Sequence, residues 1–347
     1  MAKAQRRFGT EDIEHYDRPR RRTRPRTKDR PSYDDADLGR VITVDRGRFT
    51  LVMDDAPEVE VWAVKARPLG RKGVVVGDRV KVVGDTSGSD GALARIVELE
   101  ARTTVLRRTA DDDDPVERVV VANADQLVIV TAIADPEPRT GFIDRALVAA
   151  YEAGIDPLLC ITKADLADPE SLVSTYRSLG VPWVVTQRGG DVSALKTALD
   201  GRTSVLLGHS GVGKSTLVNA IVPDADREIG HVNAVTGRGR HTSTSALMLR
   251  LPGGLTSSTT GSTTGGWIID TPGIRTFGLA HVDPAQLIVS FPDLAEAITD
   301  CPRGCTHAAG EPECGLDAAI ESGGLDPERV VSFRRLLEAR SAPAYTL

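Results

Sequence analysis

The sequence has few aromatic residues and few cysteines, and it lacks any long apolar run. Aromatic residues make up 4% of the 347 positions, so we expect cores built mainly from Val, Leu, Ile and Ala. No stretch approaches the roughly 18 apolar residues of a membrane helix, and the first residues lack an apolar segment that would direct secretion. We therefore expect a cytoplasmic protein that does not bind membranes. Its 4 cysteines should be reduced and, where clustered, should bind metal rather than form disulfides.

Charge is distributed unevenly along the chain. Residues 1–30 contain 11 Lys or Arg and 5 Asp or Glu, which leaves +6, whereas the whole chain carries a formal charge of −6. Residues 1–36 offer little apolar surface to bury, and we predict a disordered basic arm there. The arm either binds the phosphates of a nucleic acid or is a solvated tail, and both interpretations stay open.

Residues 37–105 consist of short β-rich runs separated by turn residues. Five strands within about 65 residues are typical of a small barrel, and we predict an OB-fold. Such barrels often bind RNA or oligosaccharide, but many only join domains, so the fold alone does not decide between these roles. The acidic run 111–114, followed by Pro115, is expected to be an exposed linker. The strands are expected at residues 40–44, 48–53, 59–64, 79–83 and 94–99.

The strongest motif is GHSGVGKST at residues 208–216, which fits the phosphate-loop pattern GxxxxGK[ST] at every required position. An apolar run at 205–207 precedes it, and residues 217–222 can continue as a helix. The glycines let backbone N–H groups point at phosphate oxygens, and the helix N-terminus adds a positive dipole end. We expect Lys214 to bridge the β- and γ-phosphates and the Ser215 hydroxyl to ligate Mg²⁺.

A second motif, DTPG at residues 270–273, follows the apolar run 267–269. In nucleotide switches a DxxG after a strand places Asp near Mg²⁺, usually through a water, and lets the Gly N–H contact the γ-phosphate. This predicts those two roles for Asp270 and Gly273. Many GTPases place a Gln directly after DxxG to orient the attacking water, but this chain has Ile274, so intrinsic hydrolysis should be slow.

The base-reading motif is TKAD at residues 162–165, after an apolar strand at 158–161. A carboxylate at Asp165 can accept hydrogen bonds from guanine N1–H and N2–H₂, a pair of donors that adenine lacks. The stem of Lys163 can cover the purine face. Thr162 stands where Asn is usual, and we expect this replacement to remove an amide that could tie the base loop to the phosphate loop.

These motifs occur in rotated order, because the base reader precedes the phosphate loop by about 45 residues. A strand at 181–186 that ends near Gly189 and Gly190 could supply a second base-contacting loop, and a helix at 192–199 should follow it. Residues 106–282 would then form a circularly permuted α/β domain. The segment after DTPG runs directly into the C-terminal region, so loss of the γ-phosphate could pull on that region.

The switch region is expected at residues 223–245. Thr242, Ser243 and Thr244 offer three hydroxyls, any one of which could ligate Mg²⁺. His241 is the local candidate for completing the hydrolytic site, and contact with a partner is the alternative role. Residues 253–266 are rich in Ser, Thr and Gly and are expected to form a flexible hairpin loop between two strands.

The C-terminal region, 283–347, contains a metal-binding pattern. Cys301, Cys305, His307 and Cys314 provide three thiolates and one imidazole, a complete tetrahedral zinc set that leaves no open position for water. We therefore predict a structural zinc site, whereas Cys160 lies in an apolar strand and is expected to be a core residue.

A last helix should follow the metal-binding pattern. Asp326 is its predicted N-cap and Pro327 its first helical residue. The apolar face is expected to comprise Val330, Phe333 and Leu337. Arg334 and Arg335 lie elsewhere on the helix and either pack on the metal module or contact RNA phosphates.

The order of barrel, TKAD, GHSGVGKST, RHTST, DTPG and CxxxCxH…C resembles the ribosome small-subunit-dependent GTPase family (RsgA/YjeQ), over about residues 39–340. Residues 122–126, 143–145 and 311–314 are also similar to that family. The first two cysteines of the metal pattern lie one residue closer than the family pattern. The arm and the 253–266 loop lie outside it.

The resemblance implies a circularly permuted P-loop GTPase domain between an N-terminal OB-fold barrel and a C-terminal α-helical zinc-binding domain. It also implies GTP hydrolysis stimulated by the 30S subunit during late maturation of that subunit, with the barrel and the zinc module contacting rRNA, and we expect a monomer. Lys214 and His241 are the predicted catalytic residues. The predicted GTP-binding residues are Thr162, Lys163, Asp165, Gly208, His209, Ser210, Gly211, Val212, Gly213, Lys214, Ser215, Thr216, Asp270 and Gly273.

Two other functions compete with this one. A nucleotide-gated RNA-binding module, in which hydrolysis is incidental, would share the barrel and the phosphate loop. An ATP-dependent enzyme is disfavoured, because Asp165 matches the donors of guanine.

Overall fold

The computed structural model describes residues 33–69, 73–109, 117–222, 246–252, 265–271, 279 and 282–341. Several predictions fall outside these residues: nearly all of the basic arm, the acidic run 111–114, the switch region with His241 and its three hydroxyl residues, and the pair Gly273 and Ile274. Most of the 253–266 loop lies outside them as well.

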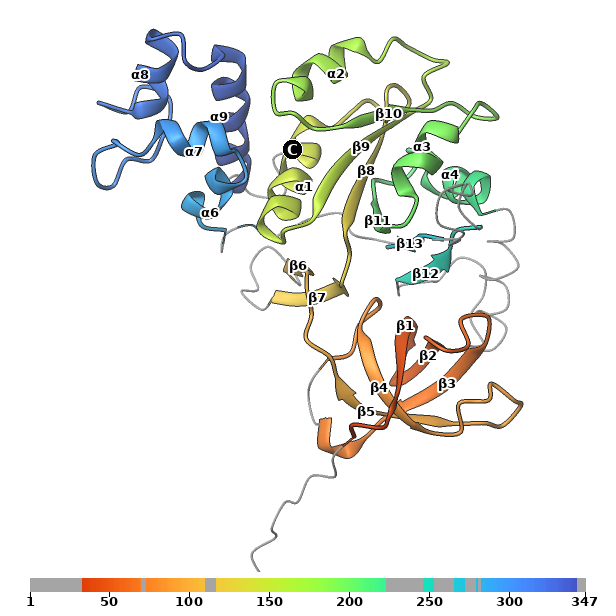
Figure 1. Ribbon diagram of the computed structural model, residues 1–347. Helices are drawn as coiled ribbons and strands as arrows, with labels where there is room; N and C mark the ends of the chain where they lie inside the picture. The colour runs from red at the N-terminus through yellow and green to blue at the C-terminus, as the bar shows by residue number, and fades with distance from the viewer. Residues whose placement is uncertain are drawn as a thin grey trace, which may run out of the picture. The chain divides into compact units, whose positions relative to one another are not determined.

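The N-terminal region is a five-stranded barrel, as predicted (Figure 1). Strand β1 pairs with both β2 and β4, β3 pairs with β2 and β5, and β5 returns to β4, so the sheet closes on itself. Alternate side chains such as Val41, Leu51 and Ile96 point inward and are fully buried. The strands are β1 (Asp37–Asp45), β2 (Arg48–Met53), β3 (Glu60–Lys65), β4 (Arg79–Gly84) and β5 (Ala94–Leu99), and a 3₁₀ turn, η3 (Arg67–Leu69), follows β3.

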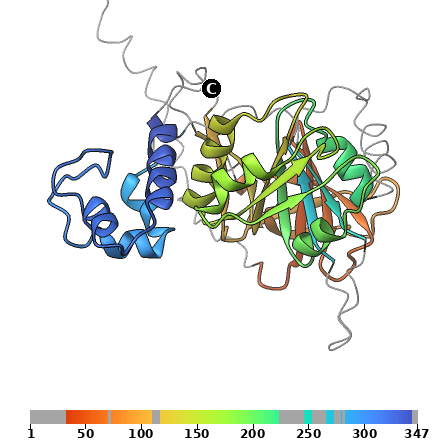
Figure 2. The same ribbon diagram turned by 90° about the horizontal axis from the view of Figure 1, so that it is seen from above.

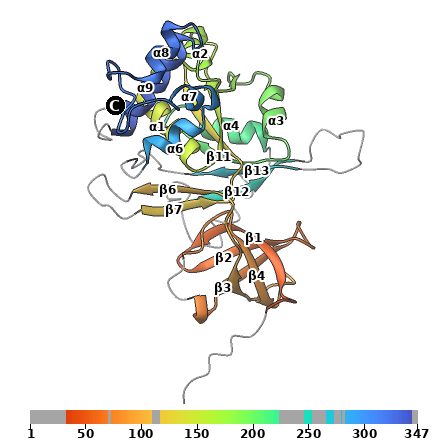
Figure 3. The same cartoon turned by 60° about the vertical axis from the view of Figure 1, so that its left-hand side comes forward.

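A two-stranded sheet that the sequence analysis did not predict follows the barrel. Strands β6 (Val105–Thr109) and β7 (Glu117–Ala122) pair in antiparallel fashion, with the acidic run in the connection between them. Leu106 and Val121 are buried in one apolar cluster with Val76, and this burial anchors the pair of strands, which Figure 3 shows side by side. The boundary predicted between residues 105 and 106 falls at the start of β6, and the domain boundaries stay predictions.

The central domain contains a mixed sheet of six strands. Strands β10, β9, β8, β11 and β13 are parallel neighbours in that order. Strand β12 joins the edge of the sheet and is antiparallel to β13. Strand β12 also meets the barrel, at Leu247 opposite Thr43 of β1. In sheet order the strands are β10 (Trp183–Val185), β9 (Asp156–Thr162), β8 (Gln126–Ala132), β11 (Thr203–Leu207), β13 (Trp267–Asp270) and β12 (Leu247–Arg250).

Helices cover both faces of this sheet (Figure 2). Side chains of α1 (Thr140–Glu152) and α2 (Glu170–Arg177) share one core with Leu127 and Ile129 of β8. Side chains of α3 (Ser193–Leu199) and α4 (Lys214–Ile221) share the other core with Val128 and Val130 of the same strand. The period-2 alternation of strand side chains therefore feeds two cores, which is why β8 is apolar along most of its length.

The parallel strands bring their carboxyl ends to one edge of the sheet. The base loop follows β9, the phosphate loop follows β11, and Asp270 ends β13. Because loops at this edge converge in open α/β sheets, residues far apart in sequence come together there. The base loop follows β9 and the phosphate loop follows β11, so the base loop comes first in the chain. This is the rotated order expected from the motifs.

The C-terminal region is helical. It comprises α6 (Pro284–Val289), α7 (Pro292–Ala297), α8 (Gly315–Glu321) and α9 (Pro327–Ser341). The predicted cap of the last helix is confirmed, because the Asp326 carboxylate accepts from the Glu328 N–H at 2.9 Å. Val330 and Phe333 are buried as predicted, Leu337 is partly buried against the same core, and Leu336, which was not predicted, is fully buried on this face, which packs on α1. None of the described helices is long and apolar enough to cross a membrane.

Candidate nucleotide site and metal cluster

Asp165 of the base loop and Lys214 of the phosphate loop line the same cavity. The cavity has a volume of about 1010 Å³ and is bounded by the loops that follow β8, β9, β10 and β11. Sites of this size at the carboxyl edge of an α/β sheet accommodate ligands as large as a nucleotide. Among the predicted GTP-binding residues, the cavity is lined by Thr162, Lys163, Asp165, Gly208, His209, Ser210, Gly211, Gly213, Lys214, Ser215 and Thr216.

The phosphate loop has the backbone geometry that its glycines permit. A Cβ atom at Gly208 would lie 2.5 Å from the Val130 carbonyl oxygen, so only Gly fits against β8 there. Gly213 has φ of +89° and is directly followed by α4, which points its first N–H groups toward the cavity. Val212, within this loop, has a buried side chain. Its backbone carbonyl accepts a hydrogen bond from the Thr162 hydroxyl of the base loop.

Asp270 does not line the cavity itself but lies directly beside Lys214. The Lys214 ammonium donates to the Asp270 carboxylate at 2.6 Å and to the Thr271 carbonyl at 3.3 Å. The Thr271 hydroxyl in turn donates to the Leu206 carbonyl at 2.9 Å, which fixes the end of β13 against β11. The first half of DTPG therefore lies at the phosphate end of the site, and Gly273 lies outside the described residues.

Thr162 corrects one expectation from the sequence. Its hydroxyl lies 2.5 Å from the Val212 carbonyl oxygen and 3.3 Å from that of Thr131, and the residue is 5% exposed. A hydrogen bond between the base loop and the phosphate loop is therefore present, although Thr replaces the usual Asn. A hydroxyl carries a single proton and donates it to the nearer Val212 carbonyl, whereas an amide could donate to both.

Lys163 is anchored by a residue that the sequence analysis missed. Its ammonium donates to the backbone carbonyl of Asp135, in the loop between β8 and α1. The neighbouring Pro136 lies 3.7 Å from the position that a Cβ atom would take at Gly211, so this loop contacts the base loop and passes close to the phosphate loop. The signal that could have identified it is topological, because the loop after β8 opens at the same sheet edge as the motif loops.

The loop after β10 forms another wall of the cavity. Residues 186–190 line it, and the Ala164 N–H donates to the Thr186 carbonyl at 3.2 Å. The strand ending near Gly189 and Gly190 therefore lies where a second base-contacting loop was expected. On the phosphate side, the His209 ring packs on Phe142 of α1, with ring centroids 4.1 Å apart.

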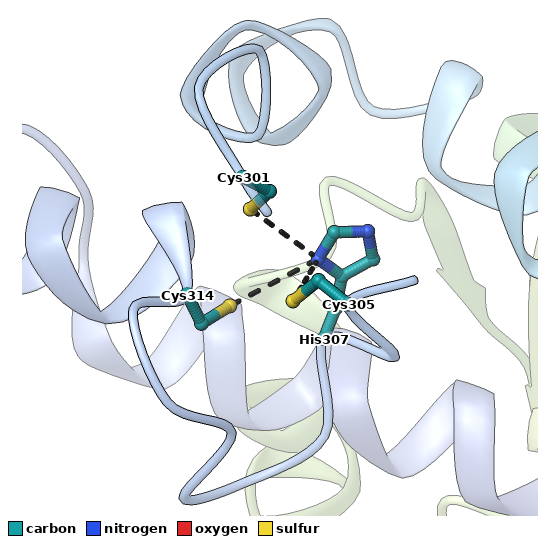
Figure 4. A group of neighbouring side chains, drawn as sticks. All are labelled: Cys301, Cys305, His307 and Cys314. Carbon is teal, nitrogen blue, oxygen red and sulfur yellow. Dashed lines mark hydrogen bonds between the residues drawn. The ribbon is translucent and has the colours of Figure 1, made fainter. Parts of the chain in front are cut away.

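The four predicted metal ligands come together in the C-terminal region (Figure 4). His307 Nδ1 lies 3.7 Å from Cys301 Sγ, 3.4 Å from Cys305 Sγ and 3.9 Å from Cys314 Sγ. Burial, and then the charge of Arg334, hold the pKa of His307 below its ordinary value, which favours the neutral imidazole that binds metals. The closer spacing of the first two cysteines therefore does not prevent the cluster from forming, and the cluster could hold a metal ion.

Backbone and side-chain groups support this cluster. The Gly315 N–H donates to Cys301 Sγ at 3.1 Å. Arg334 of α9 donates to the His307 carbonyl at 2.9 Å and makes two 2.8 Å hydrogen bonds to the Asp317 carboxylate. Arg334 therefore packs within the metal module. This agrees with the prediction that the last helix packs on that module.

Cys160 is separate from the cluster, as predicted. It is 0% exposed within β9, and burial raises the pKa of its thiol to about 12. A thiol with so high a pKa is inert at neutral pH, so this cysteine is a core residue.

Comparisons with known proteins agree with these features. A family model described as RsgA GTPase matches residues 99–280. A small ribosomal subunit biogenesis GTPase RsgA from Azotobacter vinelandii is 38% identical over 281 residues, which cover 78% of this chain and 76% of the relative. A protein of the same name from Pseudomonas syringae pv. tomato is 37% identical over 307 residues, covering 83% and 84%.

Solved structures are similar to this chain over most of its length. YjeQ from Thermotoga maritima has a TM-score of 0.62 and 26% identity, covering 87% of this chain and 97% of that one. YloQ, described as a circularly permuted GTPase, has a TM-score of 0.61 at 23% identity, covering 89% and 96%, and shares the fold.

Proposed function

Because this chain belongs to the RsgA GTPase family, we propose that it hydrolyses GTP to GDP and phosphate during late maturation of the small ribosomal subunit. The observation that carries the proposal is the shared cavity, which Asp165 and Lys214 both line from separate loops. Relatives from two genera carry the name small ribosomal subunit biogenesis GTPase. We place this activity in the cytoplasm, with the 30S subunit and its rRNA as partners of a monomeric protein.

The proposed roles follow the two ends of the cavity. The phosphate loop, 208–216, holds the phosphates through its N–H groups, and Lys214 neutralises charge that develops on the transferred phosphoryl group. Asp165 accepts from guanine N1–H and N2–H₂, while Lys163, anchored to the Asp135 carbonyl, covers the base. Magnesium would be held by Ser215, near Asp270, and would supply further charge neutralisation at the phosphates.

The hydrolytic step is proposed to depend on the ribosomal subunit. Ile274 cannot orient water by a hydrogen bond, so a partner or another side chain must complete the site, and His241 is the proposed residue. Both residues lie outside the described residues.

Purified 30S subunits should raise GTP turnover on the order of 10³-fold, the lower end of the range by which activating partners accelerate other GTPases. Turnover would be measured as phosphate release with 30S subunits, with 50S subunits as the control particle, and with neither. No stimulation by 30S, or equal stimulation by both particles, would contradict the proposed function.

We propose zinc as the ion of the Cys₃His cluster. A tetrahedral zinc with bonds of about 2.1 Å to nitrogen and 2.3 Å to sulfur has nitrogen–sulfur edges of roughly 3.6 Å. The distances of 3.7, 3.4 and 3.9 Å from His307 Nδ1 to the three sulfur atoms fit these edges. Four protein ligands leave no open position, so the zinc would stabilise the fold and take no part in hydrolysis.

The hydroxyl of Thr162 should set nucleotide affinity without setting base identity. Thr162→Val keeps the shape but leaves the buried Val212 carbonyl without its donor, which costs about 1–3 kcal/mol. We expect GTP and ITP to bind roughly tenfold more weakly, by the same factor, in a fluorescent-nucleotide competition assay. Thr162→Ser keeps the donor and is the matched control. Unchanged affinity in Thr162→Val, or a change in the GTP-to-ITP ratio, would contradict this role.

A further inference from the structure

Two adjacent arginines of α9 reach into different parts of the protein. Arg335 Nε donates to Asp144 Oδ2 of α1 at 2.9 Å, and its guanidinium lies 5.1 Å from the ring centre of Tyr176. Arg334 donates to the carbonyl of the metal ligand His307 at 2.9 Å, and its Nη2 lies 3.9 Å from Cys314 Sγ. One helix therefore contacts the central domain and the metal cluster through consecutive residues.

The contact between α9 and α1 is buried and specific. Asp144 is 3% exposed, and one of its oxygens and Arg335 Nη2 are buried with no hydrogen-bond partner among the described residues. Arg145 of α1 also donates to the Ala339 carbonyl at 3.2 Å, and at the end of α2 the Ser178 hydroxyl lies 2.9 Å from that of Ser332 in α9. Asp144 is buried whereas Arg335 is 31% exposed, so displacement of Arg335 would leave the buried carboxylate uncompensated. These polar contacts therefore fix the position of α9 along α1.

The same helix, α1, also contacts the nucleotide cavity. Phe142, in its first turn, packs on His209 of the phosphate loop with centroids 4.1 Å apart. The loop that leads into α1 contributes the Asp135 carbonyl that anchors Lys163 of the base loop. Helix α1 thus contacts the phosphate loop through Phe142 and Arg335 through Asp144, two residues later, and the loop before α1 contacts the base loop.

We propose that α1 and α9 form a rigid link, through the pairs Phe142–His209 and Asp144–Arg335, which couples nucleotide binding to retention of the metal ion. Nucleotide orders the phosphate loop and so fixes α1. Helix α9 then docks on an ordered partner and holds the His307 loop through Arg334. This link runs through α1 and α9. It is separate from the segment after DTPG, through which loss of the γ-phosphate was expected to act on the C-terminal region.

The link rests on the proposed binding of guanine nucleotide and zinc, and reciprocity provides its test. If nucleotide raises the affinity for zinc, zinc must raise the affinity for nucleotide by the same factor. Zinc transfer to the chromogenic chelator 4-(2-pyridylazo)resorcinol would be followed with and without GDP. Zinc affinity would be measured in a zinc-buffered titration with and without GDP. The affinity of a fluorescent GDP derivative would be measured in zinc-loaded and in zinc-free protein. We expect GDP to slow zinc loss and to raise zinc affinity about 5- to 20-fold.

Arg335→Met should reduce that factor to near one while the protein still binds GDP and zinc. The matched control is Arg202→Met, because Arg202 also donates to a carboxylate, that of Asp156, at 2.9 Å, but this pair is exposed and involves no residue of α1 or α9. If Arg335→Met fails to fold, the double variant Asp144→Leu with Arg335→Met removes both charges and should lose the coupling as well.

Two results would overturn the link: wild-type protein without coupling, or coupling that survives in the folded Arg335 variants. Absence of GDP or zinc binding in wild-type protein would instead contradict the proposed function. The two failures are therefore distinguishable in the same measurements.

Discussion

Replacing Lys214 with Ala is expected to lower GTP turnover about 10²- to 10³-fold, with and without 30S subunits. The ammonium lies at the start of α4, 2.6 Å from the Asp270 carboxylate, at the phosphate end of the cavity. Its removal deletes the positive charge aimed at the phosphoryl oxygens, and water cannot restore a preorganised charge there. Phosphate release under saturating GTP would measure the loss.

Lys196→Ala is the matched control for this prediction. Lys196 is an exposed residue of α3 outside the residues that line the cavity, and its replacement should leave turnover within about twofold, as is usual for surface substitutions. Wild-type turnover in Lys214→Ala would mean that the cavity described above is not where hydrolysis occurs.

Removing the metal should destabilise the C-terminal helices far more than the rest of the protein. Helices α6, α7 and α8 have only 6, 6 and 7 residues, so they have little core of their own. Zinc binding in small modules contributes on the order of 10 kcal/mol to folding. Hydrogen exchange after chelation should show loss of protection within residues 282–341 while the barrel keeps its protection.

Alkylation provides the site-specific measurement. After chelation, iodoacetamide should label Cys301, Cys305 and Cys314, whereas zinc-loaded protein should resist it. Cys160 is the internal control, because it is buried and its thiol has a pKa of about 12. Equal labelling with and without chelator, or purified protein without stoichiometric zinc, would contradict the metal assignment.

Local sequence patterns predicted most of the elements that build the site. The five barrel strands, the strands before the base and phosphate loops, and the cap of α9 at Asp326 all followed from apolar runs and from turn or cap residues. The hairpin of β6 and β7 was missed. Its strands are short and carry Arg and Glu, and the acidic run between them resembles a linker. Its stability comes instead from the burial of Leu106 and Val121 against distant residues.

Contacts between distant residues could not be read from spacing. Asp144 and Arg335 meet across 191 positions of sequence, and no local rule pairs them. Thr162 shows a different limit. The family pattern suggested that loss of Asn would lose the tie to the phosphate loop, but the hydroxyl reaches the Val212 carbonyl because the two loops approach closely enough. Residue type predicted the chemistry of the site, whereas only the fold determined which atoms meet.

The central claim is that Asp165 reads the base of the nucleotide whose phosphates Lys214 holds. Binding of GTP, ATP and XTP to wild-type protein and to Asp165→Asn tests it most directly. Wild-type protein should prefer GTP over ATP and XTP by a factor on the order of 10³ or more, because a mismatched base leaves polar groups of the site unpaired. Asp165→Asn should favour XTP, because an amide can donate to the xanthine oxygen that replaces the guanine amino group. Equal affinity of wild-type protein for ATP and GTP, or an unchanged preference in Asp165→Asn, would contradict the account.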